Sequence, residues 1–452
     1  MIGINPILSQ SRDVQYLSKL IFRSLLRVTP NFRVENDLVG EWSRINSTTY
    51  LIRLQDNILC HNGNPFTAHD VKFTIDGIKN LEADSIYKEN VQHISNVEVI
   101  DDHIIRIYLA REVPFFEYML TFPILSRETY DPYTLESLED LPIGAGPFKI
   151  AEILDEGIRL ERNAEEEAVI NIKIYQEHID LYNNLSRENI DLISTINIEF
   201  ENYIGTIGFR KYIAPGREFD FLAINTNHRI LSNQDLRRAI NYAIDRNSVV
   251  YNAYKNKYVI STFPLAYGSY LYNSNNIDNL HNVTKAREIL ITNGWENRLE
   301  FELIVNEDHI NRVMVAEIIR EQLEQVGIRI NVQRVNNSTF EKYLTSRNYQ
   351  LLLTGNVVPL YPDLSIYFGE QNLFNYRNEE IRNLLAEIND VQDIDLLKEK
   401  YRRIIEIYNE DMPFISLYFS ANILIVNNSV RGNITHNWHN IFYHIESWHK
   451  KI

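Results

Sequence analysis

The stretch LSNQDLRRAINYAIDRNSVV (residues 231–250) contains a fully specified helix pattern, and the fold can be worked out from it outward. Ser232 and Asp235 have the spacing of a capping box, in which two side chains satisfy backbone N–H groups at a helix start. Apolar residues then recur at helical intervals and form one stripe: Leu236, Ala239, Ile240, Ala243 and Ile244. A nucleophilic site or a metal site would need different residues. We therefore interpret it as a scaffold helix that packs on a core.

The composition of the chain is that of a soluble globular protein. Of its 452 residues, 44% are hydrophobic and 23% are charged, and the length corresponds to about three domain-sized units. There are 61 acidic against 45 basic residues, which gives a net charge of −16 and repels phosphate backbones. Because no cluster of Lys and Arg offsets this charge, no nucleic-acid partner is expected.

The single cysteine, Cys60, excludes an intrachain disulfide and a Cys-based zinc site. It lies in a strand-like run, where it is expected to be a small buried side chain. No run approaches the roughly 18 apolar residues that a membrane span needs. The start MIGINPILSQ does not have the pattern of a signal peptide, which predicts either a cytosolic protein or the mature part of an exported one.

The first third of the chain mixes short strands with single helices, as in an α+β segment. A turn is expected at residues 62–65, Asn-Gly-Asn-Pro, and a helix capped by Thr67 and Asp70 follows it. Two strands are expected to form a hairpin around residues 101–103. The glycine-rich run at residues 144–147 lacks the third glycine and the helix of a dinucleotide-binding loop, and we interpret it as a tight turn.

The later part of the chain alternates strands and helices. Residues 170–175, 178–189 and 190–195 predict a strand, a helix and a second strand joined by a parallel crossover. Residues 299–355 predict a β-α-β-α-β series, and Gly327 is expected to end its long helix. Thr284, and Ser338 with Glu341, are expected to cap two of the helices in this region.

Motifs of catalysis, phosphate binding and calcium binding are absent from the sequence. Four histidines near the C-terminus could suggest a metal site, but no carboxylate set accompanies them: His436, His439, His444 and His449. We therefore expect no cofactor, no resident metal and no enzymatic activity.

Several stretches, in order along nearly the whole chain, resemble the peptide/nickel-binding group (family 5) of extracellular solute-binding proteins, which feed ABC importers. Residues 4–25 are similar to the opening segment of that family, and HNGNPFTAHDVKFT (residues 61–74) to its "HDGxPFTAxDVxFT" signature. Residues 143–150, IGAGPFKI, resemble "GTGPYKL". Residues 221–250, with the scaffold helix, resemble the "AINYAIDR" region, and residues 286–295, 316–332 and 412–419 match the second lobe.

The resemblance implies an α/β, two-lobed periplasmic-binding-protein-like fold with a hinge of two chain crossings. The first lobe would take residues 1–262, with a subdomain near 37–155, and would be completed by residues 424–452. The second lobe would take residues 263–423. The lobes are expected to close over a peptide or other small solute and to present it to an ABC permease in the membrane. The resemblance further implies a monomeric, extracytoplasmic lipoprotein, lipid-anchored in its full-length form.

One position departs from the family pattern. Members often carry an aspartate, as in "DYPDP", that pairs with the α-ammonium of a bound peptide. Here the segment reads GNVVPLYPDL, so Leu360, or Val358 under a shifted alignment, occupies that place and Asp363 matches the following turn. The cleft is therefore expected to hold a blocked or modified peptide, a different solute, or a charge supplied from elsewhere. The residues expected to bind the ligand are Asn5, Asn225, Tyr267, Asn356, Val357 and Tyr361.

Two alternatives remain open at this point. The same fold serves as a cytosolic ligand-sensing domain in some regulators, which the missing signal peptide favours and the acidic charge opposes. A metal-chelate (nickel-type) binding protein is the other, with the C-terminal histidines as its only support.

Overall fold

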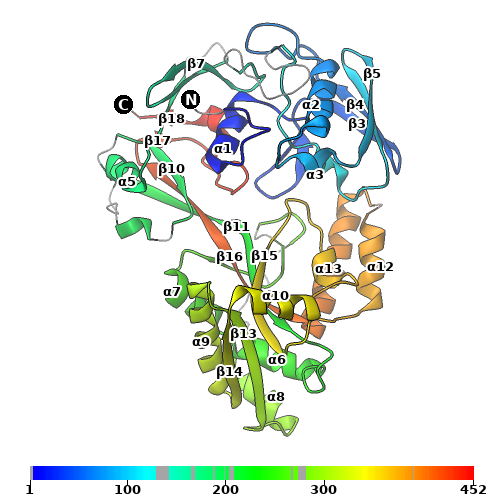
Figure 1. Ribbon diagram of the computed structural model, residues 1–452, viewed down its shortest axis with the longest axis vertical. Coiled ribbons are helices and arrows are strands. Elements are labelled where there is room, and N and C mark those ends of the chain that lie inside the picture. Colours follow the sequence, from blue (N-terminus) through cyan, green and yellow to red (C-terminus); the bar gives the residue numbers. More distant parts are fainter. Residues whose placement is uncertain are drawn as a thin grey trace. The chain divides into compact units, whose positions relative to one another are not determined.

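The structure is a computed structural model, which describes residues 4–128, 142–163, 168–186, 189–197, 199–202, 208–265, 268–272, 281–389 and 391–451. The chain forms two compact units (Figure 1). Unit 1 comprises residues 1–193, 200–211 and 424–452, and unit 2 comprises residues 194–199 and 212–423. The strands β10 (Leu192–Thr195), β11 (Phe209–Ile224) and β16 (Phe414–Asn427) each contain a point at which the chain passes from one unit to the other.

The division differs from the expected lobes at residues 212–262, which the sequence places in the first lobe and the structure groups with unit 2. The reason is strand pairing: Glu218–Ile224 of β11 pairs antiparallel with residues 351–357 of β15 (Leu351–Val357). This pairing ties β11 and the helices that follow it to the sheet of unit 2.

A four-stranded antiparallel sheet forms one part of unit 1. Its order is β3-β4-β6-β5, from β3 (Val39–Asn46), β4 (Thr49–Leu54), β5 (Ile94–Asp101) and β6 (Ile104–Leu109). The expected hairpin around residues 101–103 is confirmed, because β5 and β6 pair antiparallel across it. Helix α2 (Ala68–Asn80) packs on β5 and buries its apolar face, and the predicted capping box of Thr67 and Asp70 is present.

A second antiparallel sheet of unit 1, in the order β7-β8-β9, is formed by β7 (Phe148–Leu154), β8 (Gly157–Arg162) and β9 (Val169–Lys173). The predicted parallel crossover from β9 to β10 is therefore wrong. β9 pairs with β8, whereas β10 lies beside β16 in another sheet, and α5 (His178–Ser186) connects the two sheets instead of crossing within one.

The glycine-rich run is a close-approach turn against α1 (Arg12–Ile21). The N–H of Gly146 donates to the carbonyl of Ile21 at 2.9 Å. A Cβ on Gly146 would lie 2.5 Å from the carbonyl carbon of Ile21, so no larger residue fits there without displacing the backbone. The His61 ring hydrogen-bonds the Gly146 carbonyl at 3.0 Å and ties the Asn-Gly-Asn-Pro region to the same turn.

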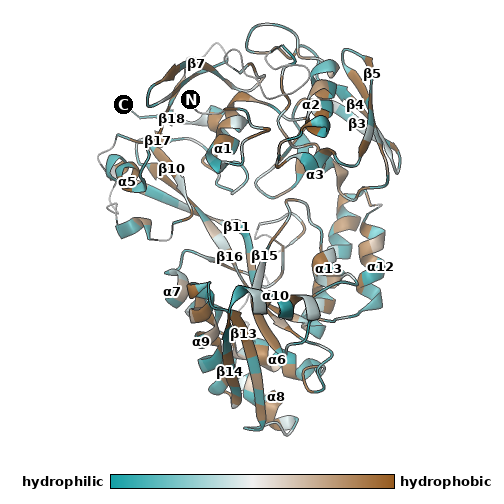
Figure 2. Ribbon diagram, in the orientation of Figure 1, coloured by the Kyte–Doolittle hydropathy of each residue, from teal (hydrophilic) through white to brown (hydrophobic). Residues whose placement is uncertain are grey.

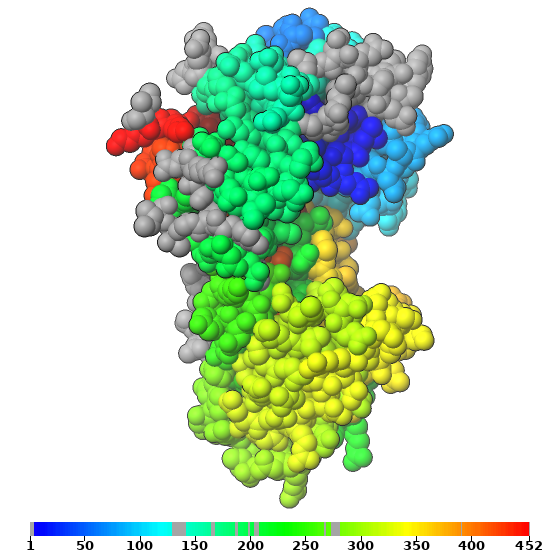
Figure 3. Space-filling view, turned by 60° about the vertical axis from the view of Figure 1, so that its left-hand side comes forward, coloured from blue at the N-terminus to red at the C-terminus, as the bar shows by residue number. Residues whose placement is uncertain are grey.

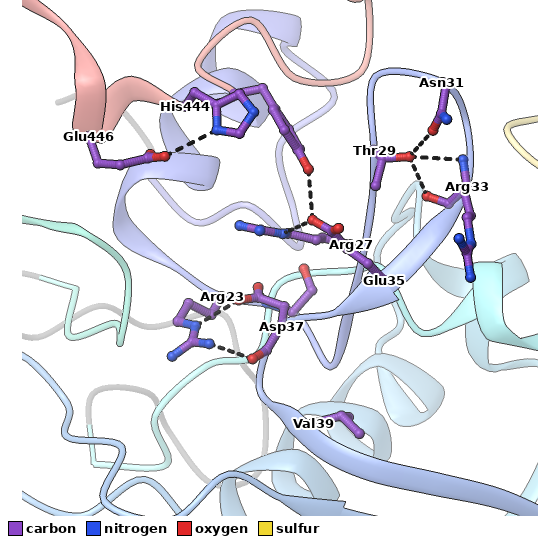
Figure 4. A network of polar contacts seen from close by, with 12 residues as sticks. Arg23, Arg27, Thr29, Asn31, Arg33, Glu35, Asp37, Val39, His444 and Glu446 are labelled. Atoms are coloured by element: carbon purple, nitrogen blue, oxygen red, sulfur yellow. Dashed lines mark hydrogen bonds and ion pairs between the residues drawn. The ribbon is translucent and has the colours of Figure 1, made fainter. Parts of the chain in front are cut away.

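The C-terminal segment of unit 1 is fastened to a short hairpin formed by β1 (Leu26–Val28) and β2 (Val34–Asn36). Arg27 donates to Glu35 at 2.6 Å, and the Tyr443 hydroxyl donates to the same carboxylate at 2.7 Å (Figure 4). Arg23 donates to Asp37 at 2.7 Å and anchors the end of the hairpin. Two short strands follow on this segment, β17 (Val430–Arg431) and β18 (His449–Lys450), and pair with each other.

The sheet of unit 2 is built around two long buried strands. Its order is β10-β16-β11-β15-β13-β14, with β12 (Val259–Ile260) paired to β16. β13 (Leu299–Asn306) pairs parallel with both β14 (Ile328–Val335) and β15, which confirms the predicted β-α-β-α-β series. Its crossover helices are α9 (Ile310–Glu324) and α10 (Asn337–Ser346), and Gly327 follows α9 at φ 86°, as expected of a helix stop. Apolar residues alternate with charged or polar ones along β14 and the first half of β13, whereas residues 303–305 of β13 are apolar and buried throughout; Figure 2 colours the apolar residues brown.

The scaffold helix is α6 (Gln234–Ala243), with Leu236, Ala239, Ile240 and Ala243 buried as predicted. Its cap is different from the expected one: Asn233, and not Ser232, accepts a hydrogen bond from the N–H of Leu236 at 3.2 Å. Asparagine also caps α8 (Val283–Thr292) and α10, through Asn282 and Asn336, where Thr284 and Ser338 were expected. The chain uses the amide side chain of the residue immediately before each helix, since Asn is as good an N-cap as Ser or Asp.

The remaining helices complete unit 2. These are α7 (Arg246–Tyr254), α11 (Ser365–Phe368), α12 (Glu379–Ile388) and α13 (Ile394–Asp411). In Figure 3 the visible face of unit 2 is formed largely by the yellow-green and yellow segment that includes α9, β14 and α10. Within the described residues, no helix combines the length and the hydropathy that a membrane crossing requires.

Candidate functional site

A charged pair lies in the sheet of unit 2. Arg312, in the first turn of α9, donates through Nε and Nη2 to the two carboxylate oxygens of Asp220 on β11, at 2.8 and 2.7 Å. The side chain of Asp220 is 6% exposed and that of Arg312 is 20% exposed. Burial lowers the pKa of Arg312, but the hydrogen bonds and the charge of Asp220 outweigh burial and raise that pKa overall. Arg312 therefore stays ionised and binds the carboxylate of Asp220 in a bidentate pair.

Three tyrosines extend this pair. The Tyr418 hydroxyl donates to Oδ2 of Asp220 at 3.1 Å and shares a second hydrogen bond of 3.1 Å with the hydroxyl of Tyr254. The ring of Tyr258 stacks on that of Tyr254 with the centroids 3.8 Å apart. Burial, with the nearby charges of Glu218 and Asp220, raises the pKa of Tyr258 to about 12, so the hydroxyl group stays protonated. The cluster offers hydrogen-bonding groups and no candidate for proton transfer at neutral pH.

The end of β15 lies next to this pair along the ladder, because Asp220 pairs with Gly355 and Phe219 pairs with Asn356. Asn356 accepts a hydrogen bond from the Tyr367 hydroxyl at 2.9 Å, while the side chain of Val357 is 55% exposed. Tyr361 and Leu360 follow, both partly buried. Asn356 and Val357 at the end of β15 and Tyr361 in the loop after it thus belong to one short segment.

The loop after β15 contains one carboxylate, and a helix uses it. Asp363 accepts a hydrogen bond from the backbone N–H of Ser365 at 2.8 Å, at the start of α11. The carbonyl of Pro362 accepts a hydrogen bond from the hydroxyl of Tyr401 on α13, which ties the loop to that helix. Leu360 supplies no carboxylate to this loop, and the one that the loop contains, Asp363, is engaged at α11.

Asn225 lies elsewhere. It directly follows Ile224, the last residue of β11. Ile224 pairs with Leu351, six ladder positions away from the pairing of Glu218 with Val357. Its Nδ2 donates to the carbonyls of Arg347 and Tyr349, at 3.3 and 2.8 Å. Its Oδ1 accepts from the N–H of Asn227 and from Nδ2 of Asn375, both at 3.1 Å. The structure gives this side chain a role in joining loops and does not bring it near Asn356.

Of the two other expected residues, the structure describes only Asn5. Asn5 is 8% exposed in unit 1, and its Oδ1 accepts from the N–H of Ile7 at 2.9 Å. Gln15 of α1 holds the same loop by donating to the carbonyls of Pro6 and Ser9, at 2.8 and 2.7 Å. Tyr267 lies outside the described residues.

The C-terminal segment of unit 1 contains enclosed polar atoms that have no partner. They include Nδ2 of Asn437 and Nε2 of His439. The segment lies beside α1, since the Tyr16 hydroxyl donates to the Trp438 carbonyl at 3.0 Å, and Figure 1 shows it passing that helix. Burial, aided by the charge of Lys19, lowers the pKa of His439 to about 3, so its ring is neutral at physiological pH.

Metal ligation finds no support in the described residues, where no group of three or more His, Cys, Asp or Glu side chains could hold an ion. Cys60 is buried, and burial raises the pKa of its thiol to about 11, which makes it unreactive.

Four candidate functional residues were not recognised in the sequence: Asp220, Arg312, Asn437 and His439. His439 was considered there only as a possible metal ligand. A signal existed only for Asp220, as a charged residue inside an otherwise apolar strand, FDFLAIN. Such a residue in a buried strand requires a partner. The partner itself, 92 residues further on, has no signature in the sequence.

A comparison with known families settles the group to which the chain belongs. The profile of bacterial extracellular solute-binding proteins, family 5 (middle region), matches residues 33–372. The chain belongs to this family. The family assignment made from the sequence motifs is thereby confirmed, and family 5 proteins are binding proteins that act outside the cytoplasm.

Individual relatives agree with the assignment. The oligopeptide-binding protein AppA of Bacillus subtilis is 22% identical over 96% of this chain and 86% of its own length. The nickel-binding protein NikA of Staphylococcus aureus is 21% identical over 90% of this chain and 85% of its own length. The structure of HbpA2 from Haemophilus parasuis superposes with a TM-score of 0.84 at 22% identity, covering 99% of this chain and 97% of that one. This likeness confirms the expected α/β periplasmic-binding-protein fold of this family 5 protein.

Proposed function

We propose that this family 5 protein is the substrate-binding component of an ABC importer and captures a peptide or peptide-like solute for delivery to a membrane permease. The observation that carries the proposal is the family profile, which matches from residue 33 to residue 372. An oligopeptide-binding relative that covers 96% of the chain supports the peptide class. A cytosolic sensor is not favoured, because the family is extracellular.

Leu360, in the place expected for an aspartate that pairs with a peptide's α-ammonium group, restricts the class of solute that the protein could bind. A free α-ammonium taken out of water needs an anionic partner, and an unpaired buried charge costs several kcal/mol. In the loop after β15, Asp363 already accepts a hydrogen bond from the N–H of Ser365, and Leu360 has only an apolar side chain. The solute is therefore a peptide whose amino end is blocked, modified, or held by another part of the chain.

The residues proposed to contact the solute are Asn5, Tyr267, Asn356, Val357 and Tyr361. Two of these residues in unit 2 have structural support. Val357 is exposed, and the side-chain oxygen of Asn356 is oriented by the hydrogen bond that it accepts from the Tyr367 hydroxyl. Asn225 is left out of this set, because its four hydrogen bonds join loops of unit 2.

Capture is expected to involve closure of two lobes, with the solute binding the closed form more tightly than the open one. The protein is proposed to act as a monomer, without a cofactor and without catalytic turnover. In its full-length form it is proposed to be lipid-anchored at the outer face of the cell membrane. Metabolic labelling of the native protein with a radioactive fatty acid tests the anchor.

The solute class is tested with protein that has been unfolded, dialysed and refolded to remove any solute carried through purification. Native mass spectrometry then measures which members it retains from two matched pools of two- to five-residue peptides, one free and one N-acetylated. The wild-type protein is expected to retain N-acetylated peptides in preference to free ones.

The variant Leu360→Asp supplies the missing carboxylate and is expected to shift retention toward free peptides by at least tenfold. A conservative control, Leu360→Met, should keep the wild-type preference. If the wild-type protein retains no peptide from either pool but retains nickel–histidine, the peptide class is wrong and chelate capture replaces it.

A further inference from the structure

The C-terminal segment of unit 1 contains a donor and an acceptor that the fold encloses and leaves unused. Asn437 is 3% exposed, and its Oδ1 accepts from the N–H of Asn440 at 2.7 Å, which fixes the orientation of the amide. Its Nδ2 has no partner. A buried N–H group without an acceptor is rare in folded proteins, because the group loses its hydrogen bonds to water and gains none.

His439, two residues further on, provides the complementary atom. Its ring forms a hydrogen bond with the backbone of Thr29 that favours the protonated ring, as a bond donated to a carbonyl does. Nε2 has no partner, and Nδ1 is not among the enclosed atoms that lack one, so we assign the bond to Thr29 to Nδ1. In the neutral ring Nδ1 then carries the hydrogen, and Nε2 is an acceptor without a donor.

The charges around this ring keep it neutral. Lys19 on α1 and His436 on the same segment both disfavour a proton on His439. Asp37 lies near enough to Lys19 to act on its ammonium group, but Asp37 is held by Arg23 and by the N–H of Ser24. No carboxylate is among the groups that act on His439, so its acceptor nitrogen persists across the physiological pH range.

One free donor and one free acceptor on neighbouring residues match a peptide group, which presents a C=O and an N–H. We propose that Asn437 and His439 form a main-chain subsite in unit 1: Nδ2 of Asn437 donates to a carbonyl of the solute, and Nε2 of His439 accepts an N–H. The inference rests on the proposed function and specifies how unit 1 recognises a peptide whatever its side chains.

The subsite is closed in this structure, and Phe32 is part of its cover. The Phe32 ring packs edge-on against the His439 ring with the centroids 5.4 Å apart. Phe32 also has a φ of 66°, a backbone conformation that costs energy for a bulky residue. Admission of a solute would therefore require this hairpin tip to move.

The test uses isosteric substitutions that remove the polar atoms, Asn437→Leu and His439→Phe. Matched controls are Asn433→Leu and His449→Phe, which make the same changes at exposed positions of the same segment. Refolded, solute-free proteins are offered the pools of free and N-acetylated peptides, together with a third pool in which one amide is replaced by an ester. Retention is read by native mass spectrometry and the Tm by circular dichroism.

Both variants are expected to lose at least tenfold in peptide retention. Their solute-free Tm is expected to fall only modestly, because each loses one satisfied hydrogen bond, from the N–H of Asn440 or to Thr29, together with one unsatisfied buried atom. The wild-type protein should retain esters at least tenfold less than amides, and both controls should behave as wild type. Unchanged retention in both variants would overturn this inference and would leave the proposed function untouched.

Two further outcomes separate this inference from the proposed function. If wild-type protein retains no peptide from any pool, the proposed function fails and the subsite fails with it. If His439→Phe abolishes retention of nickel–histidine and leaves peptide retention intact, the ring serves a metal chelate and the assignment to a peptide group is wrong.

Discussion

Arg312 holds Asp220 through two parallel hydrogen bonds, of 2.8 and 2.7 Å, directly over Gly355. The two residues come from a helix and a strand that are 92 residues apart, and they meet at the ladder position just before Asn356. The pair therefore fixes the strand end from which the proposed contact loop begins. Its geometry, planar and bidentate, is the one in which an arginine gives the most positional constraint.

Removing one partner of this pair is expected to be costly. Asp220→Ala leaves Arg312 partly enclosed without its counter-ion, and the free energy of unfolding should fall by about 2–3 kcal/mol, less than for a fully buried pair because Arg312 is 20% exposed. Guanidinium denaturation followed by tryptophan fluorescence measures the change.

The double variant Asp220→Leu/Arg312→Leu is the control, since it removes both charges. It should recover at least half of the loss, because replacement of a buried pair by apolar residues is close to neutral. A double variant that is less stable than Asp220→Ala would contradict this account and would show that the charges themselves stabilise the sheet.

Gly355 is predicted to be the glycine of unit 2 least tolerant of a side chain. A Cβ there would lie 2.0 Å from Oδ1 of Asp220 and 2.7 Å from the carbonyl of Phe219. Gly355→Ala should lower the free energy of unfolding by about 1–3 kcal/mol, as overpacking of a filled site does, and should weaken solute binding by displacing Asn356. Gly40→Ala is the matched strand control, because its Cβ meets nothing closer than 3.6 Å. Equal stability of the two variants would refute the prediction.

The fold could be predicted from the sequence to the extent that local rules determine it. The β-α-β-α-β series from β13 to β15 and the hairpin of β5 and β6 follow from apolar periodicity and turn residues. The partner of β10 could not be predicted in this way. β10 lies beside β16, more than 200 residues later, and a short strand carries no local information about so distant a neighbour.

The candidate site shows the same limit. Asn356, Val357 and Tyr361 were placed together because they are adjacent in sequence, and Asn225 was added because a family motif contains it. The hydrogen bonds that commit Asn225 to residues 347, 349 and 375 arise only when three separate segments meet. The buried atoms of Asn437 and His439 that lack a hydrogen-bond partner can likewise be identified only from the folded structure.

Acid is predicted to destabilise the protein partly through His439. Burial lowers the pKa of this ring to about 3 in the native state, against about 6.5 when it is unfolded. The unfolded chain therefore takes up a proton that the native state refuses, and stability present above about pH 6.5 is lost as the pH falls toward 3, by at most about 1.4 kcal/mol per pH unit.

The contribution of His439 is isolated by measuring the Tm of wild type and His439→Phe from pH 7.5 to pH 4.5. The difference in Tm should move in favour of the variant as the pH falls. His61 also has a pKa lowered by burial, but it is present in both proteins and cancels. Parallel Tm curves for the two proteins would contradict the prediction.

Asn225 is predicted to matter for stability and not for affinity. Its side chain donates to the carbonyls of residues 347 and 349 and accepts from Asn227 and Asn375, so Asn225→Ala leaves two carbonyls and two N–H groups without partners. The free energy of unfolding should fall by about 1–3 kcal/mol, while the affinity for a retained N-acetylated peptide, measured by titration calorimetry, stays within twofold. The matched variant Asn356→Ala should show the reverse, a loss of affinity of tenfold or more with a smaller effect on stability. A tenfold loss of affinity in Asn225→Ala at unchanged stability would return this residue to the solute site and remove the distinction that the hydrogen bonds support.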